Sequence, residues 1–396
     1  MDSEDRTIEC HGASAPKAWD AQVGSYRVGL NHHPIDPRNV RRITVRSGDD
    51  DCIVEIAPSK GLSLRSARFG DRELLWELPL ANLPDPEMID LAGTVWIRGA
   101  ARPGAAWVRY FAAGIELLGL DHWGMYDGQG ATLHGNASMI PVRYAVFREG
   151  SGAIEVSGEF HIADPVAVLP EPTRSPYYRV GRTIRIDATR RTIYQCDRIT
   201  NLSDDPRTPD WGYHVQLRPE PGSRYLVPAR STHPRRSPDE RPPADADTWR
   251  PVADSRTRRE RGYVHRDVLQ AAAFPDGSPG VETLLLHPDG TGVACTIPPA
   301  PYTLSWFSSG GAHDPNVSLP TGPGGALVPV FERNWDGVGP EIGASALDAD
   351  GDVDPAVAPR RLEPGDYLDL QLLLRPVDTD EATSIAQRIF HYRGTR

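Results

Sequence analysis

The sequence has few of the features that mark membrane, secreted or disulfide-bonded proteins. No apolar run approaches the roughly 18–20 residues that a membrane-spanning helix needs. The acidic start, Met-Asp-Ser-Glu-Asp-Arg-Thr, lacks the apolar stretch of a signal peptide. The four cysteines, Cys10, Cys52, Cys196 and Cys295, are far apart and form no Cys-x-x-Cys pair. We therefore expect a cytoplasmic protein with free thiols and no structural zinc.

Positive charge and nucleotide-binding motifs are also scarce. The formal net charge of −11 disfavours a nucleic acid or an anionic membrane as the main partner. No Gly-x-Gly-x-x-Gly or P-loop pattern follows a strand-like segment. We expect no cofactor and no bound metal.

Turn-forming residues, in contrast, are abundant. The chain has 37 glycines and 38 prolines against 4 methionines, which favours many turns and few long helices. Short strand-like segments recur along the chain without a regular alternation with helices, so the pattern predicts an all-β sandwich or barrel. One helix is expected, at Thr379–Phe390. The main expected strands are Ile43–Arg46, Cys52–Ile56, Leu62–Phe69, Val142–Phe147, Ala153–Phe160, Tyr178–Ile186, Thr192–Ile199, Gly212–Leu217, Tyr225–Val227, Val281–Leu286, Val293–Ile297, Tyr302–Phe307, Leu327–Phe331 and Leu368–Leu374.

Two segments break this pattern. Residues 1–20 are polar, and we expect them to be loosely ordered. Residues 229–262 are rich in Arg, Asp and Pro with almost no apolar periodicity, which predicts a long surface loop. The remainder, residues 21–396, is expected to form a single domain that carries this loop.

Three polar residues are the candidate catalytic groups: His134, His214 and Glu341. Each lies on or beside a strand-like segment. Two imidazoles and a carboxylate can supply a general acid and a general base near neutral pH. They are so far apart in the sequence that only a large fold could bring them together. The alternatives are two hydrogen-bonded structural histidines and a carboxylate at an exposed strand end.

The order of these residues resembles that of the aldose 1-epimerase-like (galactose mutarotase-like) superfamily, and in particular its DUF4432-type branch, a group described as a domain of unknown function. The resemblance covers roughly residues 40–375, and its motifs occur in the family order. The matching segments are Ala57–Leu64, Ala113–Gly124, Leu133–Pro141, Gly181–Ile186, Asp197–Leu202, Gly212–Leu217, Val338–Gly343 and Arg361–Asp366.

The resemblance implies a large antiparallel β-supersandwich and an isomerase that opens and closes a sugar hemiacetal without a cofactor. In the family a Glu is the base, a His near the middle of the chain is the acid, and an earlier His helps to bind the sugar ring. Carried over, these are Glu341, His214 and His134. The implied partner is a small carbohydrate or glycoside, with no nucleic acid and no membrane. A homodimer is the assembly to test.

Five further residues are candidates for substrate binding. His122 and Trp123 precede His134 in a Gly-rich stretch, and Trp306 lies where the family has a tryptophan on a late strand. Lys60 and Arg143 could hold a carboxylate or a phosphate. For each of them the alternative is an ordinary structural role, as loop packing, as core packing or as a solvated charge.

Two departures from the family motifs keep other functions open. Val215-Gln216-Leu217 replaces the usual Asn-Phe-Gly, and Pro340 precedes Glu341 where the family has a proline after the Glu. The same acid–base site could serve a sugar lyase or a keto-sugar epimerase, or the chain could bind carbohydrate without turnover. If the carry-over is right, the three side chains converge on one solvent-accessible pocket, with functional groups roughly 5–9 Å apart, because acid and base act on one carbon.

Overall fold

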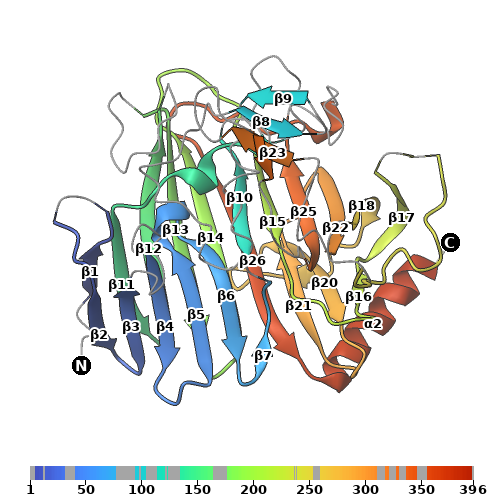
Figure 1. The fold of residues 1–396 in the computed structure, drawn as a ribbon, viewed down its shortest axis with the longest axis horizontal. Coiled ribbons are helices and arrows are strands. Elements are labelled where there is room, and N and C mark those ends of the chain that lie inside the picture. The colour runs from blue at the N-terminus through green and yellow to red at the C-terminus, as the bar shows by residue number, and fades with distance from the viewer. Residues whose placement is uncertain are drawn as a thin grey trace.

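The computed structural model describes residues 5–11, 14–31, 41–76, 94–97, 100–103, 114–120, 123, 134–163, 176–235, 237, 239–252, 259–309, 317–320, 327–329, 336–345 and 355–394. Within them, strands predominate and are arranged in two large antiparallel sheets and one small one (Figure 1). The predicted all-β supersandwich is confirmed. No helix in this part of the chain is long and apolar enough to cross a membrane.

The first large sheet has ten strands, and β19 pairs with β20 beside its main path. In spatial order its strands are β1 (Arg6–Glu9), β11 (Tyr144–Gly150), β12 (Ala153–Ile162), β13 (Tyr178–Asp187), β14 (Thr192–Asn201), β26 (Tyr367–Val377), β21 (Gly292–Ile297), β20 (Pro279–Leu286) and β16 (Arg224–Leu226), with β19 (Ala272–Ala273).

The second large sheet has twelve strands and carries the candidate site; β7 pairs with β6 beside its main path. In spatial order its strands are β17 (Ala229–Pro234), β18 (Arg259–Val268), β22 (Tyr302–Ser309), β25 (Gly337–Ala344), β15 (Trp211–Val215), β10 (Ile115–Gly119), β6 (Ser63–Phe69), β5 (Cys52–Ala57), β4 (Arg42–Ser47), β3 (Tyr26–Asn31) and β2 (Trp19–Val23), with β7 (Arg72–Glu73).

The remaining elements are short, apart from one helix. The small sheet has the order β24 (Leu327–Pro329), β23 (Val317–Pro320), β8 (Thr94–Ile97) and β9 (Ala100–Pro103). Three 3-10 turns are η1 (Pro58–Lys60), η4 (Ala137–Met139) and η5 (Pro355–Val357). The helix α2 (Thr379–Gly394) confirms the expected C-terminal helix and buries Ile385 and Ile389 in one cluster with Leu226 and Leu284.

The two large sheets bury a shared apolar core and one charged network. Val215 and Ile342 of the twelve-stranded sheet belong to the same core cluster as Leu370 and Leu372 of the ten-stranded sheet. This burial supplies most of the folding free energy, at about 25 cal/mol per Å² of apolar surface removed from water.

The charged network ties the strand of His214 to the facing sheet. Arg182 donates two hydrogen bonds to the Asp197 carboxylate, at 2.6 and 2.9 Å, and a third to the carbonyl of Gly61. The hydroxyl of Tyr213 donates to the same carboxylate at 2.6 Å. Because Tyr213 directly precedes His214, the network fixes β15 at the site.

The structure corrects two of the segment assignments. Within residues 1–20, expected to be loosely ordered, Arg6–Glu9 forms β1 and pairs with β11 at the sheet edge. Within residues 229–262, expected to be a surface loop, Ala229–Pro234 forms β17 and β18 begins at Arg259, and the two pair with each other. β1 and β17 are polar strands at sheet edges, and their pairing does not require the apolar alternation used to find buried strands.

Candidate active site

Three titratable residues lie side by side on neighbouring strands of the twelve-stranded sheet. Glu116 on β10 pairs with His214 on β15, and His214 pairs with Glu341 on β25. Directly paired residues of antiparallel strands share one face, and neighbouring strands are roughly 4.8 Å apart. Tyr213 faces the core between the sheets, so alternation along β15 places this row on the opposite face.

His134 reaches the same place from a loop. Its φ is 61° and that of the following Gly135 is 72°, in the left-handed region that residues other than glycine rarely adopt. The His134 N–H donates to the Trp123 carbonyl at 2.8 Å, and the His134 carbonyl accepts from the Gly119 N–H at 3.1 Å. These bonds tie the loop to the end of β10 and hold a conformation that costs about 1 kcal/mol or more.

The structure brings the three candidate catalytic residues together around the Glu341 carboxylate. Its Oε1 lies 3.9 Å from His134 Nδ1, and its Oε2 lies 3.9 Å from His214 Nε2. The two imidazole rings lie edge to face with their centroids 5.8 Å apart. The three side chains therefore converge, at shorter range than expected, and the solvent-accessible pocket expected around them stays a prediction. The side chains are largely buried: 13% of His134, 6% of Glu341 and 3% of His214 is exposed.

Burial changes the acid–base properties of this group. It raises the pKa of Glu341 to about 7, with the positive charge of Arg235 acting in the opposite direction and Glu260 adding to the rise. Burial also lowers the pKa of His134 well below its ordinary value, and the charges of His214 and Arg235 lower it further. Near neutral pH the site thus holds a carboxyl close to its own pKa beside a neutral imidazole.

Trp306 is the predicted binding residue that contacts this group. Its ring meets the ring of His214 edge to face, with centroids 5.1 Å apart. Its indole N–H donates to Glu260 Oε1 at 3.1 Å. With 4% of its surface exposed, Trp306 packs mainly against His214 and its strand neighbours.

Trp123 packs on the same strand as His214, and His122 lies outside the described residues. A Cβ added to Gly212 would lie 3.3 Å from Trp123 Cε2, so the indole covers the glycine two positions before His214. The Trp123 ring also meets that of Tyr302 edge to face, with centroids 5.4 Å apart. A Cβ at position 212 would also lie 2.4 Å from the Ile342 carbonyl oxygen, so the close approach of β25 requires a glycine there.

Lys60 has a protein partner in place of the expected substrate anion. Its Nζ lies 2.9 Å from Glu116 Oε1, and Ser138 Oγ lies 3.2 Å from Glu116 Oε2. Lys60 is 2% exposed, and burial lowers its pKa. Because Glu116 is the cross-strand neighbour of His214 on the same face of the sheet, this buried pair packs beside the site.

Arg143 does not join the group. It directly precedes β11, and its guanidinium donates to Glu9 of β1 at 3.0 Å and lies over the Tyr144 ring at 5.0 Å. These partners belong to the ten-stranded sheet, whereas His134, His214 and Glu341 lie together on the twelve-stranded sheet. The pairing of β1 with β11 is the physical reason, since it brings the Glu9 carboxylate to Arg143.

The structure adds two residues that were not among the sequence candidates. Gln216 Nε2 lies 2.5 Å from His214 Nδ1. Arg235 follows β17. Its side chain packs over Gly262, because a Cβ there would lie only 3.3 Å from Arg235 Cδ. Gly262 is the strand partner of Trp306, so Arg235 lies next to Trp306. Gln216 could have been found from its position two residues after His214, which places it on the same face. Arg235 had no such signal, because it lies in a segment without periodicity.

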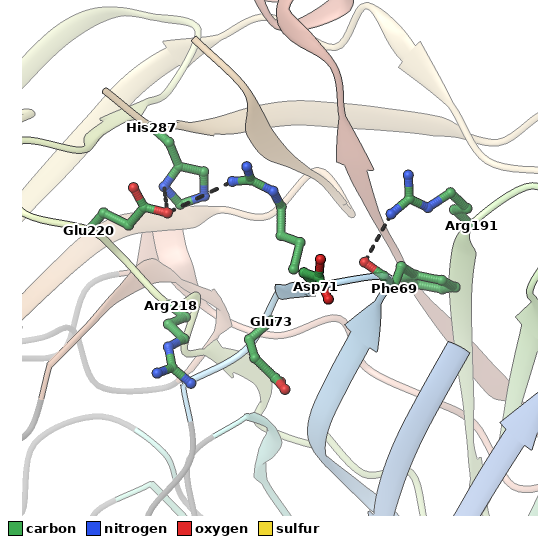
Figure 2. A pocket seen from close by; sticks show the side chains of 8 residues that line it. Phe69, Asp71, Glu73, Arg191, Arg218, Glu220 and His287 are labelled. Carbon is green, nitrogen blue, oxygen red and sulfur yellow. Dashed lines mark hydrogen bonds and ion pairs between the residues drawn. The ribbon is translucent and has the colours of Figure 1, made fainter. Parts of the chain in front are cut away.

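A cavity of about 440 Å³ lies elsewhere, at the ends of several strands and turns. Figure 2 shows its lining, in which His287 faces Glu220 and Arg191 donates to the carbonyl of Phe69. Both basic and acidic side chains line it, and none of the candidate catalytic residues contributes. Among the described residues, no group of three or more His, Cys, Asp or Glu is arranged to hold a metal ion.

Comparison with known proteins identifies the family. The model of the family described as Domain of unknown function (DUF4432) matches residues 37–295, more than half of the chain, and the chain belongs to that family. No curated protein matches the chain.

Solved structures with the same fold are distant in sequence. A candidate aldose 1-epimerase from Klebsiella pneumoniae is 16% identical with a TM-score of 0.64, over 99% of this chain and 97% of that one. A galactose mutarotase-like protein from Clostridium acetobutylicum is 10% identical with a TM-score of 0.51, over 86% and 96%. A candidate mutarotase from Salmonella typhimurium is 10% identical with a TM-score of 0.52, over 89% and 94%. At these identities the likeness establishes the galactose mutarotase-like fold.

Proposed function

We propose that this protein is an aldose 1-epimerase-like isomerase that interconverts the anomers of a sugar, with Glu341 as general base and His214 as general acid. The observation that carries the proposal is the Glu341 carboxylate, buried and 3.9 Å from both the His134 and the His214 rings. The likeness of the fold to mutarotase-like structures supports it. The motif order that resembles the same superfamily is consistent with it.

The chemistry requires two proton transfers: the anomeric hydroxyl loses a proton and the ring oxygen gains one. Ionised Glu341 takes the proton of the anomeric hydroxyl, the bond between the anomeric carbon and the ring oxygen breaks, and His214 protonates the ring oxygen. Rotation of the open aldehyde and the reverse transfers then close the ring on its other face. Both oxygens are bonded to one carbon, so acid and base must reach a single small locus.

The raised pKa of Glu341 suits the role of base. A carboxylate with a pKa of about 7 is a stronger base than an ordinary one and is still substantially ionised at neutral pH. His134, kept neutral by burial, can hydrogen-bond to sugar hydroxyls without adding a charge. Trp306, against the His214 ring, provides an apolar surface for the sugar.

Measuring anomeric equilibration tests the proposal directly. Freshly dissolved single anomers of hexoses, pentoses and uronic acids are followed by NMR or polarimetry with and without enzyme. We expect faster equilibration of at least one sugar, and a loss of about 10²–10⁴-fold of that rate in Glu341→Gln. Glu363→Gln, an exposed carboxylate, is the matched control and should keep the wild-type rate. No acceleration across the panel would refute the proposal.

The same reactions run in deuterated water separate the alternative functions. Mutarotation exchanges only hydroxyl protons, so the sugar carbons should stay free of deuterium. Deuterium at a carbon would instead indicate proton abstraction beside a carbonyl, as in a lyase or a keto-sugar epimerase. Tight sugar binding without any turnover would indicate a carbohydrate-binding protein.

A further inference from the structure

A buried amide lies directly behind the ring of His214. Gln216 follows His214 by two residues, which places both side chains on one face of the chain, and it is fully buried. Its Nε2 lies 2.5 Å from His214 Nδ1. Its backbone is held on both sides, since its N–H donates to the Gly114 carbonyl at 2.7 Å and its carbonyl accepts from the Trp76 N–H at 2.8 Å. The amide therefore has a fixed place beside the ring.

With the amide nitrogen facing the ring, this contact favours one tautomer of the neutral ring. The nitrogen of a side-chain amide only donates, so His214 Nδ1 must accept through its lone pair. The ring proton then lies on Nε2, because the hydrogen bond at one nitrogen sets the state of the other. Nε2 is the atom that faces Glu341 Oε2 at 3.9 Å.

The other end of the amide suits the protonated ring. Among the described residues, Oε1 of Gln216 has no hydrogen-bond partner. When the ring is protonated, Nδ1–H and the amide NH₂ would meet as two donors. A half-turn of the amide about its last single bond brings Oε1 to Nδ1–H and restores the hydrogen bond. Gly337 leaves room beside Oε1, since a Cβ there would lie only 2.4 Å from it.

We propose that Gln216 is a positioning residue for His214: its amide holds the neutral ring with the proton on Nε2, and it turns over to accept from Nδ1–H when the ring is protonated. The statement about the ring needs no sugar, whereas its catalytic consequence rests on the proposed function. In that reaction the protonated His214 gives its Nε2 proton to the ring oxygen while Oε1 stays on Nδ1–H, so the ring is a transient Nδ1–H tautomer, distinct from the resting neutral ring, and the amide does not turn over within the step. The reverse transfer returns the proton to Nε2.

Nitrogen-15 NMR of the histidine rings tests the first part without a substrate. The His214 signals are assigned by their loss in His214→Asn. We expect the neutral wild-type ring to carry its proton on Nε2. Gln216→Met has no donor for the ring and only a weak acceptor, and should give a mixture of the two tautomers. Gln216→Glu, which accepts only, should move the proton to Nδ1 and keep the protonated ring to higher pH.

The other charged groups around the ring are the same in all variants. Glu116 on β10, Glu341 on β25, His134 from its loop and Arg235 are unchanged, so a difference between variants is due to position 216. Circular dichroism establishes that each variant is folded, and Gln216→Met decides alone if the buried charge of Gln216→Glu prevents folding. An unchanged tautomer and titration of His214 in Gln216→Met would overturn the proposal.

Kinetics with an active sugar test the second part. We expect kcat of Gln216→Met to fall by about tenfold or more, a fraction of what general acid catalysis supplies, while KM changes little. Gln216→Glu should recover part of kcat with its optimum at higher pH. If the His214 tautomer changes with the residue at position 216 but the protein is inactive on every sugar, the role of Gln216 is supported and the proposed function is refuted. If the enzyme is active but its kcat is the same in all position-216 variants, only the catalytic consequence is refuted.

Discussion

The Glu341 carboxyl is unusual among the acidic residues because burial destabilises its charged form. Its side chain is 6% exposed, and burial raises its pKa from about 4.5 to about 7. The neighbouring imidazole of His134 does not compensate, since burial keeps it neutral near pH 7. The site thus retains a basic carboxylate at the expense of stability, which is common for catalytic groups.

Glu341 should therefore make the folded protein less stable as the pH rises. Below about pH 4.5 its carboxyl is protonated in both states and costs nothing. Between about pH 4.5 and 7 the unfolded chain releases this proton and the folded chain keeps it, so the free energy of unfolding falls. The loss levels off above pH 7, at no more than about 3–4 kcal/mol.

Urea unfolding of wild type and Glu341→Gln at pH 5 and pH 8 measures this effect. We expect the variant to gain stability relative to wild type between the two pH values, because glutamine does not titrate. All other titrating groups are common to both proteins and cancel in the difference. Parallel stability profiles for the two proteins would contradict the raised pKa.

The extent to which single residues could be predicted depends on local signals. His134, His214 and Glu341 could be singled out from short motifs that resemble those of one superfamily, despite departures beside His214 and Glu341, and their catalytic roles stay predictions. The buried pair of Lys60 and Glu116 could not, since only the strand register places Glu116 beside His214. The same holds for Arg143, whose partner on β1 is far away in the sequence.

At the scale of elements, the network beneath β15 contains a buried ion pair that can be compared with an exposed one. Arg182 and Asp197, on β13 and β14, have side chains 1% and 0% exposed. Arg198 and Asp369, on β14 and β26, make a similar two-bond contact with side chains 54% and 28% exposed. The two pairs share the two-bond contact and differ in access to water, and only the buried carboxylate also accepts from Tyr213, so their comparison measures burial together with that network.

Asp197→Asn should destabilise the fold far more than Asp369→Asn. The first leaves the Arg182 charge buried without an anion and should cost about 3–5 kcal/mol. The second removes a solvent-screened pair and should cost less than about 1 kcal/mol. Urea unfolding of both variants is the measurement, and equal costs would mean that the network does not hold β15. Asp197→Asn should also slow any sugar reaction, because Tyr213 precedes His214.

Central strands could be predicted from the sequence and edge strands could not. β13 and β14 alternate buried and more exposed residues along most of their ten positions, since both lie inside a sheet with one face in the core, although the polar residues Arg182 and Asp197 occupy two of the buried positions. β1 and β17 lie at sheet edges and are polar, so their strand character comes from hydrogen bonding to a neighbour. Which strands are neighbours is a property of the whole chain and has no local signal.

At the scale of the whole molecule, strands from the end of the chain lie in the middle of both sheets. β25 lies between β22 and β15, and β26 lies between β14 and β21 (Figure 1). The family model ends at residue 295, before β22, β25 and β26 begin. The matched part is therefore not a structural unit, and the site is incomplete without Glu341 on β25.

A fragment of residues 1–295 should consequently fail to fold. Without β25 and β26, β15 and β14 each lose a neighbour from the sheet interior, and Leu370 and Leu372 are missing from the core. The exposed strand edges favour aggregation. We expect an insoluble product, or a soluble one without a cooperative thermal transition by circular dichroism, where the full chain shows one. Cooperative unfolding of the fragment would show that the first 295 residues fold alone, and that the later strands add Glu341 to a preformed scaffold.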